Sequence, residues 1–130
     1  MALRLTLKKG EPVIVNGVVL RTMSRTDLLV ETEATVLRGR EVMKPEEATT
    51  PARKLYFACM MAYIDPIHLE KHQQTLLQQL RALIEAFEAP EAKAVCVRFA
   101  ENVAAGSFFK ALADCKWIIG YETEALCRGT

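Results

Sequence analysis

The chain has 130 residues, of which 51% are apolar and 25% charged, and its formal net charge is +1. These values are ordinary for a globular protein and predict one compact unit with a buried core. No stretch approaches the ~18 apolar residues of a membrane span, and the N-terminus lacks the apolar run of a signal peptide, so we expect a cytoplasmic protein that does not engage a membrane.

The first part of the chain has the two-residue period of short β-strands. Leu3, Leu5 and Leu7 alternate with polar residues, and the run from Lys9 to Pro12 breaks the pattern. Asn16-Gly17 is the strongest hairpin signal, because both residues tolerate the positive φ of a type I′ turn. The predicted strands lie around residues 3–7, 13–15, 18–20, 28–30 and 35–37.

These segments predict an antiparallel sheet of four to five strands within residues 3 to about 42. A sheet this small must close into a barrel, pack on helices or pair with a second chain. Because open sheet edges need cover, we expect a homo-oligomer, specifically a homodimer.

The period changes to 3.6 residues within residues 44–66, which carry two helix-start signals. Thr50-Pro51 combines an N-cap residue with proline at the first helical position, and Asp65-Pro66 repeats that combination. Between them, Leu55, Cys59 and Tyr63 share one helical face. The sequence therefore predicts a first helix from Thr50, with Asp65 as the cap of the next.

Three further helices are expected after Pro66. One of about twenty residues carries an apolar stripe from Leu69 to Phe87, the next begins at Pro90 and stops at Gly106-Ser107, and the last spans Phe108 to about Leu126. The predicted fold class is α+β. A small β module, residues 1–44, precedes an α-helical module of four helices, residues 45–130, and we expect the two to pack together as one compact unit.

No pattern in the chain indicates catalysis or a cofactor. His68 and His72 have an i, i+4 spacing that can bind metal, but the HExxH order and a marked third ligand are missing. The four cysteines, Cys59, Cys96, Cys115 and Cys127, form no CxxC pair, and we expect buried thiols with Cys127 the most exposed. The sequence predicts neither an enzyme nor a metal protein.

Three segments resemble the FlbT family of flagellar-biosynthesis regulators: LRLTLKKGE at the start, PEEATTPARKLYF at the junction, and AGSFFKALADCKWIIGYE near the end. The likeness covers nearly the whole chain. It implies a post-transcriptional repressor that associates with the 5′ untranslated region of flagellin mRNA and promotes its degradation, so the expected partner is a flagellin mRNA leader.

The opening LRLTLKKGEPVIVNG also resembles CsrA-type carbon-storage regulators, small dimeric β proteins that bind mRNA leaders. In that family two consecutive arginines and one near the last strand contact RNA. Here Leu7 replaces the first, Lys8 stands for the second, and Arg38 or Arg40 could stand for the third. This departure puts a shared RNA-binding surface in doubt.

The charge distribution favours RNA contact on the first part of the chain. Residues 1–54 hold ten Lys/Arg against seven Asp/Glu, a formal +3, whereas residues 55–130 hold seven against nine, a formal −2. Ordinary solvated surface charge is the alternative interpretation. If RNA is bound, the densest basic clusters are the expected contacts: Lys8, Lys9, Arg38, Arg40, Arg53 and Lys54.

A protein-binding chaperone or adaptor is the second functional class, acting on flagellin or on FlaF, the small protein functionally paired with the FlbT family. Its candidate surface is formed by Phe108, Trp117 and Tyr121, with Trp117 partly exposed. Core packing of the same aromatic residues is the alternative.

Overall fold

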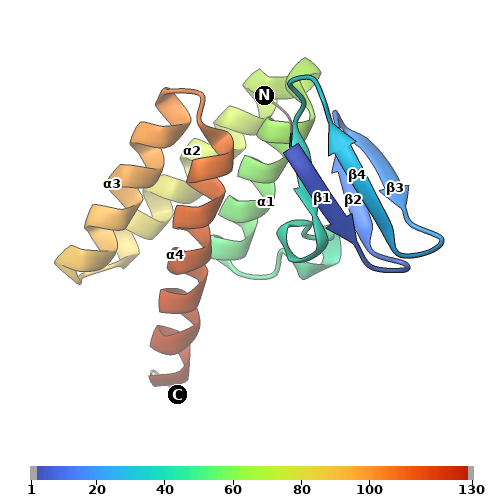
Figure 1. Cartoon of the computed structure of the whole chain (residues 1–130). Helices are drawn as coiled ribbons and strands as arrows, with labels where there is room; N and C mark the ends of the chain where they lie inside the picture. The colour runs from blue at the N-terminus through green and yellow to red at the C-terminus, as the bar shows by residue number, and fades with distance from the viewer. Residues whose placement is uncertain (1–2, 129–130) are drawn as a thin grey trace. The chain divides into compact units, whose positions relative to one another are not determined.

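The computed structural model describes residues 3–128 and divides the chain into two compact units, Met1–Val42 and Met43–Thr130 (Figure 1). The first contains all the strands described and the second four α-helices, which confirms the α+β prediction. The boundary lies within two residues of the expected one. Packing of the two units as one body remains a prediction.

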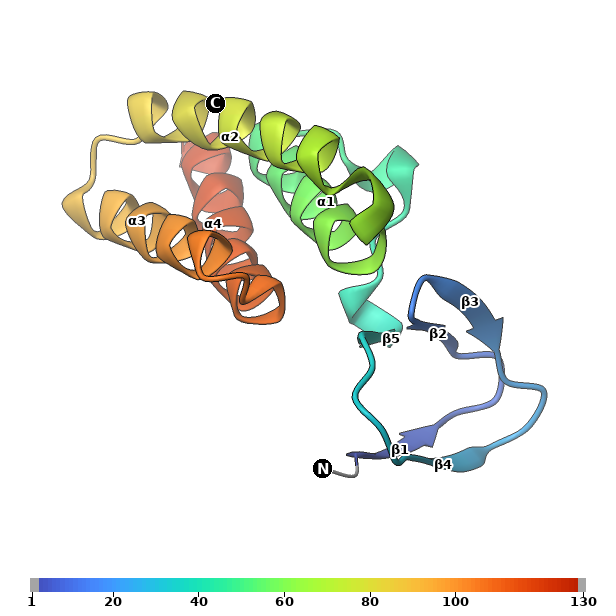
Figure 2. The ribbon, with the colours of Figure 1, turned by 90° about the horizontal axis from the view of Figure 1, so that it is seen from above.

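The β unit contains two small antiparallel sheets where a single sheet was expected (Figure 2). β1 pairs with β4, and β2 pairs with β3 on one side and β5 on the other. The strands are β1 (Leu3–Leu7), β2 (Pro12–Val15), β3 (Val18–Arg21), β4 (Thr26–Val30) and β5 (Val36–Arg38). β3 and β4 are consecutive but not paired, so both keep an open edge.

The β2–β3 hairpin turns at Asn16-Gly17, as predicted. Asn16 has φ +49° and Gly17 φ +82°, and Asn16 is the single non-glycine residue with positive φ among residues 3–128. The Asn16 Oδ1 atom also accepts the N–H of Thr35 at 3.0 Å. This side chain therefore fixes both the turn and the segment that enters β5.

The core of the β unit is small. Leu5, Leu7, Val13 and Val36 form it, and Val15, Val30 and Ala34 pack against it. All four residues of β3 are exposed, although three of them are large and apolar. The exposed apolar residues of β3, β4 and their connection are Val18, Val19, Leu20, Met23, Leu28 and Leu29.

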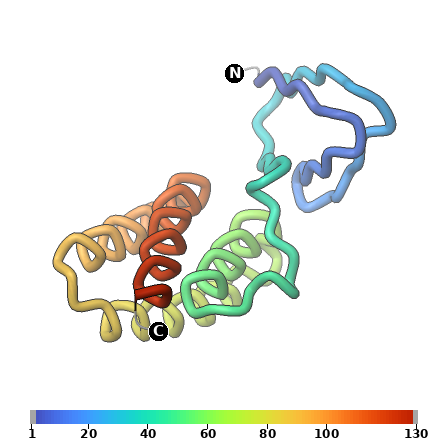
Figure 3. Tube along the Cα trace, turned by 90° about the horizontal axis from the view of Figure 1, so that it is seen from below, coloured from blue at the N-terminus to red at the C-terminus, as the bar shows by residue number. Residues whose placement is uncertain are grey.

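The helical unit contains α1 (Pro51–Ile64), α2 (Leu69–Ala86), α3 (Pro90–Ala104) and α4 (Phe108–Arg128). Short 3₁₀ turns, Gly39–Glu41, Pro45–Glu47 and Pro66–His68, precede α1 and α2. α1 packs against α2 and α4, while α3 packs mainly on α4 (Figure 3). Within the described residues, no helix is long and apolar enough to cross a lipid bilayer.

The N-terminus of α1 is capped from two directions. Thr50 Oγ1 accepts the N–H of Arg53, as the sequence predicted, and the buried Glu122 of α4 accepts the N–H of Ala52 at 2.9 Å. Proline at position 51 has no N–H to satisfy. The carboxylate also lies at the positive end of the α1 dipole, so it ties the two helices together electrostatically.

Asp65 does not cap α2 as expected. Its backbone closes α1 through an N–H to the Met61 carbonyl, a 3₁₀ turn follows, and α2 begins only at Leu69. The carboxylate is occupied instead by histidines, because Oδ2 contacts His68 Nδ1 and His72 Nε2, both at 3.0 Å. These two stronger partners replace the backbone amides.

Candidate functional site

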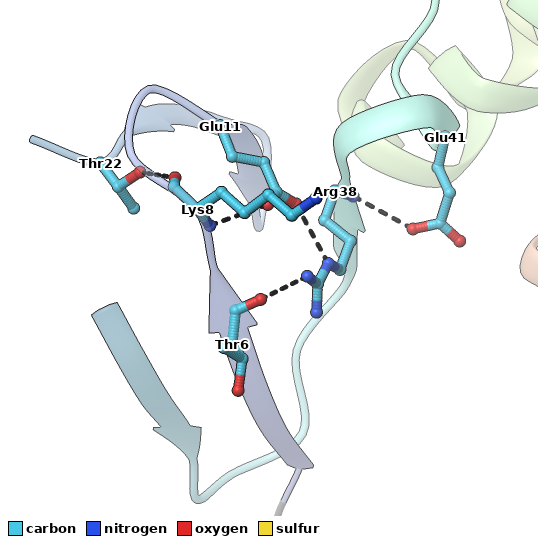
Figure 4. A network of polar contacts seen from close by, with 6 residues as sticks. All are labelled: Thr6, Lys8, Glu11, Thr22, Arg38 and Glu41. Atoms are coloured by element: carbon cyan, nitrogen blue, oxygen red, sulfur yellow. Dashed lines mark hydrogen bonds and ion pairs between the residues drawn. The ribbon is translucent and has the colours of Figure 1, made fainter. Parts of the chain in front are cut away.

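A turn in the β unit, residues 8–11, is organised by the carboxylate of Glu11 (Figure 4). Glu11 Oε1 accepts the backbone N–H of Lys8 at 3.0 Å, and Oε2 accepts Arg38 Nε at 3.3 Å. The Lys8 hydrogen bond first, and then the charge of Arg38, hold the pKa of Glu11 below its ordinary value. The Glu11 carboxylate therefore links its own turn to Arg38, which lies 27 residues later in the chain.

Arg38 connects the two sheets. Its guanidinium also donates from Nη2 to the carbonyl of Thr6 in β1, and its backbone N–H donates to Glu41 Oε1 at 3.1 Å. β1 and β5 belong to different sheets, and this side chain links them. Arg38 is half-buried.

The end of β3 adds a cation that the sequence interpretation missed. Arg21 Nη1 donates to the carbonyl of Gly10 at 2.8 Å, and Thr22 Oγ1 donates to the carbonyl of Lys8. Gly10 has φ +79°, which L side chains rarely adopt, and its carbonyl faces Arg21. The sequence contained a signal for this contact. Counting back from the Asn16-Gly17 turn pairs Arg21 with Pro12, so Arg21 lies opposite the end of the Gly10 turn.

We name the five residues around Glu11 the cationic cluster: Lys8, Lys9, Arg21, Arg38 and Arg40. Gly39 passes close to Glu11, since a Cβ on it would lie 3.2 Å from Oε2, and this places Arg40 next to the turn. All members except Arg38 are exposed. Two carboxylates, Glu11 and Glu41, lie beside these five cations, so the cluster keeps an excess of positive charge.

The other two basic candidates lie in the helical unit, on the first turn of α1. Arg53 is half-buried and its backbone N–H contributes to the Thr50 cap, while Lys54 is exposed. Lys54 lines a shallow groove between α1 and α2 with Phe57, Met61 and His72.

The aromatic candidates separate into two places on α4. Trp117 and Tyr121 stack with ring centroids 5.5 Å apart and planes 9° apart, and Phe87 contacts Tyr121 edge-on at 5.1 Å. Phe108 lies nine residues earlier and is half-buried, with its carbonyl accepting the Cys59 thiol. The structure therefore joins Trp117 and Tyr121, adds Phe87, and leaves Phe108 at the start of the helix.

Asp65, Asp114 and Glu122 are carboxylates of the helical unit with structural partners. Hydrogen bonds from His72 and His68 lower the pKa of Asp65, and within residues 3–128 no group of three possible metal ligands is found. Cys59, Cys96 and Cys115 are buried and Cys127 is exposed, as predicted. Burial raises the pKa of the Cys59 thiol to about 12, so this thiol is protonated and unreactive at neutral pH.

Comparison with known proteins gives one consistent result. The model of the family described as "Flagellar protein FlbT" matches residues 3–126. The flagellum biosynthesis repressor protein FlbT of Caulobacter vibrioides (strain ATCC 19089 / CIP 103742 / CB 15) is 35% identical over 97% of this chain and 90% of that protein.

Two further relatives are named as probable flagellum biosynthesis repressor proteins FlbT. The one from Caulobacter sp. (strain K31) is 35% identical over 97% of both chains. The one from Brucella anthropi is 37% identical over 85% of this chain and 73% of that protein. No solved structure matches this chain significantly.

Proposed function

This chain belongs to the FlbT family of flagellar proteins, a regulatory family and not an enzyme family, and from that premise we propose that it is a post-transcriptional regulator of flagellum biogenesis. It associates with the 5′ untranslated region of flagellin mRNA and promotes degradation of that message. The observation that carries the proposal is the cationic cluster in a chain whose relatives are named flagellum biosynthesis repressors.

The cluster has the features of a surface for RNA phosphates. Lys8, Lys9, Arg21 and Arg40 are exposed, while Glu11 and Arg38 fix the backbone that carries them. Exposed cations held by a rigid turn keep their charge available and lose little side-chain freedom on binding. Such contacts are independent of RNA sequence and weaken as the salt concentration rises, because the release of counterions on binding then becomes less favourable.

The deciding experiment replaces two exposed members of the cluster. Lys8→Ala with Arg40→Ala removes two charges and spares Arg38, whose loss would also release Glu11 and Thr6. Binding of an RNA covering a flagellin 5′ untranslated region is measured at two salt concentrations. We expect weaker binding and a salt slope reduced by about one unit per lost phosphate contact.

Lys110→Ala with Lys116→Ala is the matched control, because both lysines are exposed and lie on α4. It should leave the affinity and the slope unchanged. Equal losses of RNA affinity in both double variants would show that the RNA surface was assigned to the wrong unit. No loss of affinity in either would contradict RNA binding by this protein. Arg53→Ala with Lys54→Ala then tests whether the start of α1 extends the surface.

We propose that the protein acts as a homodimer formed through the β unit. Val18, Val19 and Leu20 occupy a strand whose outer edge is open and whose side chains are all exposed. A second copy presents the same open edge and the same apolar side chains, so one symmetric pairing covers both.

Val19→Glu should convert this dimer to a monomer, measured by light scattering at micromolar concentration. Val97→Glu on α3 is the matched control, because Val97 is 52% exposed and Val19 69% exposed. A wild-type monomer, or equal effects of the two substitutions, would contradict the dimer.

A protein-binding adaptor acting on flagellin or FlaF is the second candidate function. It is favoured by the position of Trp117, which is 36% exposed beside Tyr121. Docking on this face should depend less on salt than RNA binding, which should weaken steeply as salt rises. A capture experiment scored for both RNA and protein at two salt concentrations separates the two functions.

A further inference from the structure

Gly120 lies within α4, where neither its backbone conformation nor its contacts with the rest of the chain require a glycine. Gly120 has no positive φ, and a Cβ built on it would meet nothing within 4 Å. Glycine inside a helix is less favourable than alanine, because it loses more backbone freedom on folding. The residue therefore weakens α4 without relieving any contact inside the protein, which is expected where another molecule approaches the helix closely.

Gly120 forms the floor of a surface hollow of about 260 Å³, which is also lined by Trp117, Tyr121 and Glu124. Trp117 and Glu124 are seven residues apart, which is roughly 10 Å along the helix axis. A side chain lying over Gly120 would have an indole on one side and a carboxylate on the other. Tyr121, stacked on Trp117 and held by Phe87, fixes the aromatic wall.

Glu124 is the one charged residue among the four that line the hollow. It is exposed and forms no ion pair within residues 3–128, and Glu88 directly follows Phe87, whose ring contacts Tyr121. Lys116 lies one turn before Gly120 and Arg128 one turn after Glu124 on the same face of α4, but neither lines the hollow. An electron-rich ring and a free carboxylate attract a cation and repel a phosphate.

We propose that this hollow binds an arginine side chain presented by a partner protein. A guanidinium can stack on the Trp117 ring and at the same time pair with the planar carboxylate of Glu124, which a lysine ammonium does less well. The backbone of the partner passes over Gly120, where the missing Cβ gives it room. This site is independent of RNA contact by the β unit, so either proposal can fail alone.

Trp117 is the one tryptophan of the chain, so its emission reports directly on the hollow. The probe is a capped alanine-based helical peptide with one central arginine, and its control is the same peptide with uncharged, isosteric citrulline. We expect saturable change in Trp117 emission with the arginine peptide and about fivefold weaker binding of the citrulline peptide. Glu124→Gln should produce a similar loss with the arginine peptide.

Gly120→Leu should abolish the response by filling the floor of the hollow. Thr123→Leu adds similar bulk at another exposed position of α4 and should bind as the wild type does. The melting temperature of the Gly120→Leu variant should not fall, because leucine favours the helix. A fall would mean that Gly120 is needed for folding and would contradict the proposal.

Three other results would overturn the assignment. Equal binding of the arginine and citrulline peptides would show that the hollow does not recognise a positive charge. Emission that depends on protein concentration without peptide would make a second copy of the chain the occupant. A response to a short RNA but not to the peptide would make the hollow a base-stacking surface.

Discussion

The two units of this chain differ in how completely they bury their apolar side chains. The helical unit holds its core deep inside, with Leu55, Phe99 and Ile118 fully buried, whereas the β unit exposes a whole apolar strand. The helical unit thus has fully buried core residues on α1, α3 and α4, whereas β3 keeps an open apolar edge of the kind that a second chain can cover.

The largest expected effect is in the helical core. Phe99→Ala on α3 should lower the free energy of unfolding by about 3–5 kcal/mol, because the site is fully buried and leaves a cavity. Val19→Ala in β3 should change it by less than about 0.5 kcal/mol at concentrations where the protein is monomeric. Urea unfolding measures both, followed by Trp117 fluorescence for the helical unit and by amide hydrogen exchange for the β unit. Equal effects of the two substitutions would contradict the difference between the units.

The next effect tests the link between α1 and α4. Glu122→Ala leaves the N–H of Ala52 buried without an acceptor and should cost about 1–3 kcal/mol. Glu122→Gln keeps an acceptor oxygen and loses only the attraction to the helix dipole, so it should cost less. Glu124→Ala, at an exposed position two residues away in the same helix, is the control for thermal unfolding, and a loss of equal size there would refute the role of Glu122.

A smaller effect is expected at the hairpin of the β unit. Asn16→Ala puts at φ +49° a residue that cannot hydrogen-bond through its side chain, and it also removes the acceptor for the Thr35 N–H. The free energy of unfolding should fall by about 1–2 kcal/mol. Asn16→Gly restores the turn but not the acceptor and should recover part of the loss. Amide hydrogen exchange in β2 and β3 measures this, and identical exchange in both variants would show that the turn conformation is unimportant.

The local parts of the fold could be predicted because each rests on neighbouring residues. Asn16-Gly17 specifies its turn, and Thr50-Pro51 specifies the start of α1. Asp65 was assigned as a cap by the same local rule, and here the rule failed because His72, seven residues away, competes for the carboxylate. Local signals do not describe partners that only the folded chain brings close.

The candidate site shows the same limit. The predicted single sheet did not show how Lys8 and Arg38 meet, because Glu11 joins them across two separate sheets. Arg21 was missed because its place beside Gly10 depends on the hairpin register. Glu122 had a visible signal, a carboxylate in an apolar helical stripe, whose partner 70 residues earlier could not be identified from spacing.

The smallest expected effect concerns pH and the Glu11 anchor of the β unit. The pKa of Glu11 is lower in the folded chain than its ordinary value of 4.5, because the Lys8 N–H and then Arg38 stabilise the charged form. A carboxyl group with a lowered folded pKa stabilises the folded state above 4.5, and this contribution disappears as pH falls through the folded pKa. Glu11→Gln should therefore destabilise the β unit at pH 7, and the difference from the wild type should shrink as the pH falls below 4.5. The effect is small because solvent screens the pair, with the side chain of Arg38 35% exposed.

Amide hydrogen exchange of β1 and β5 against pH measures this effect, with Glu31→Gln at an exposed position as the control. A difference between wild type and variant that stays constant from pH 7 to pH 3 would show that Glu11 acts through shape and not through charge.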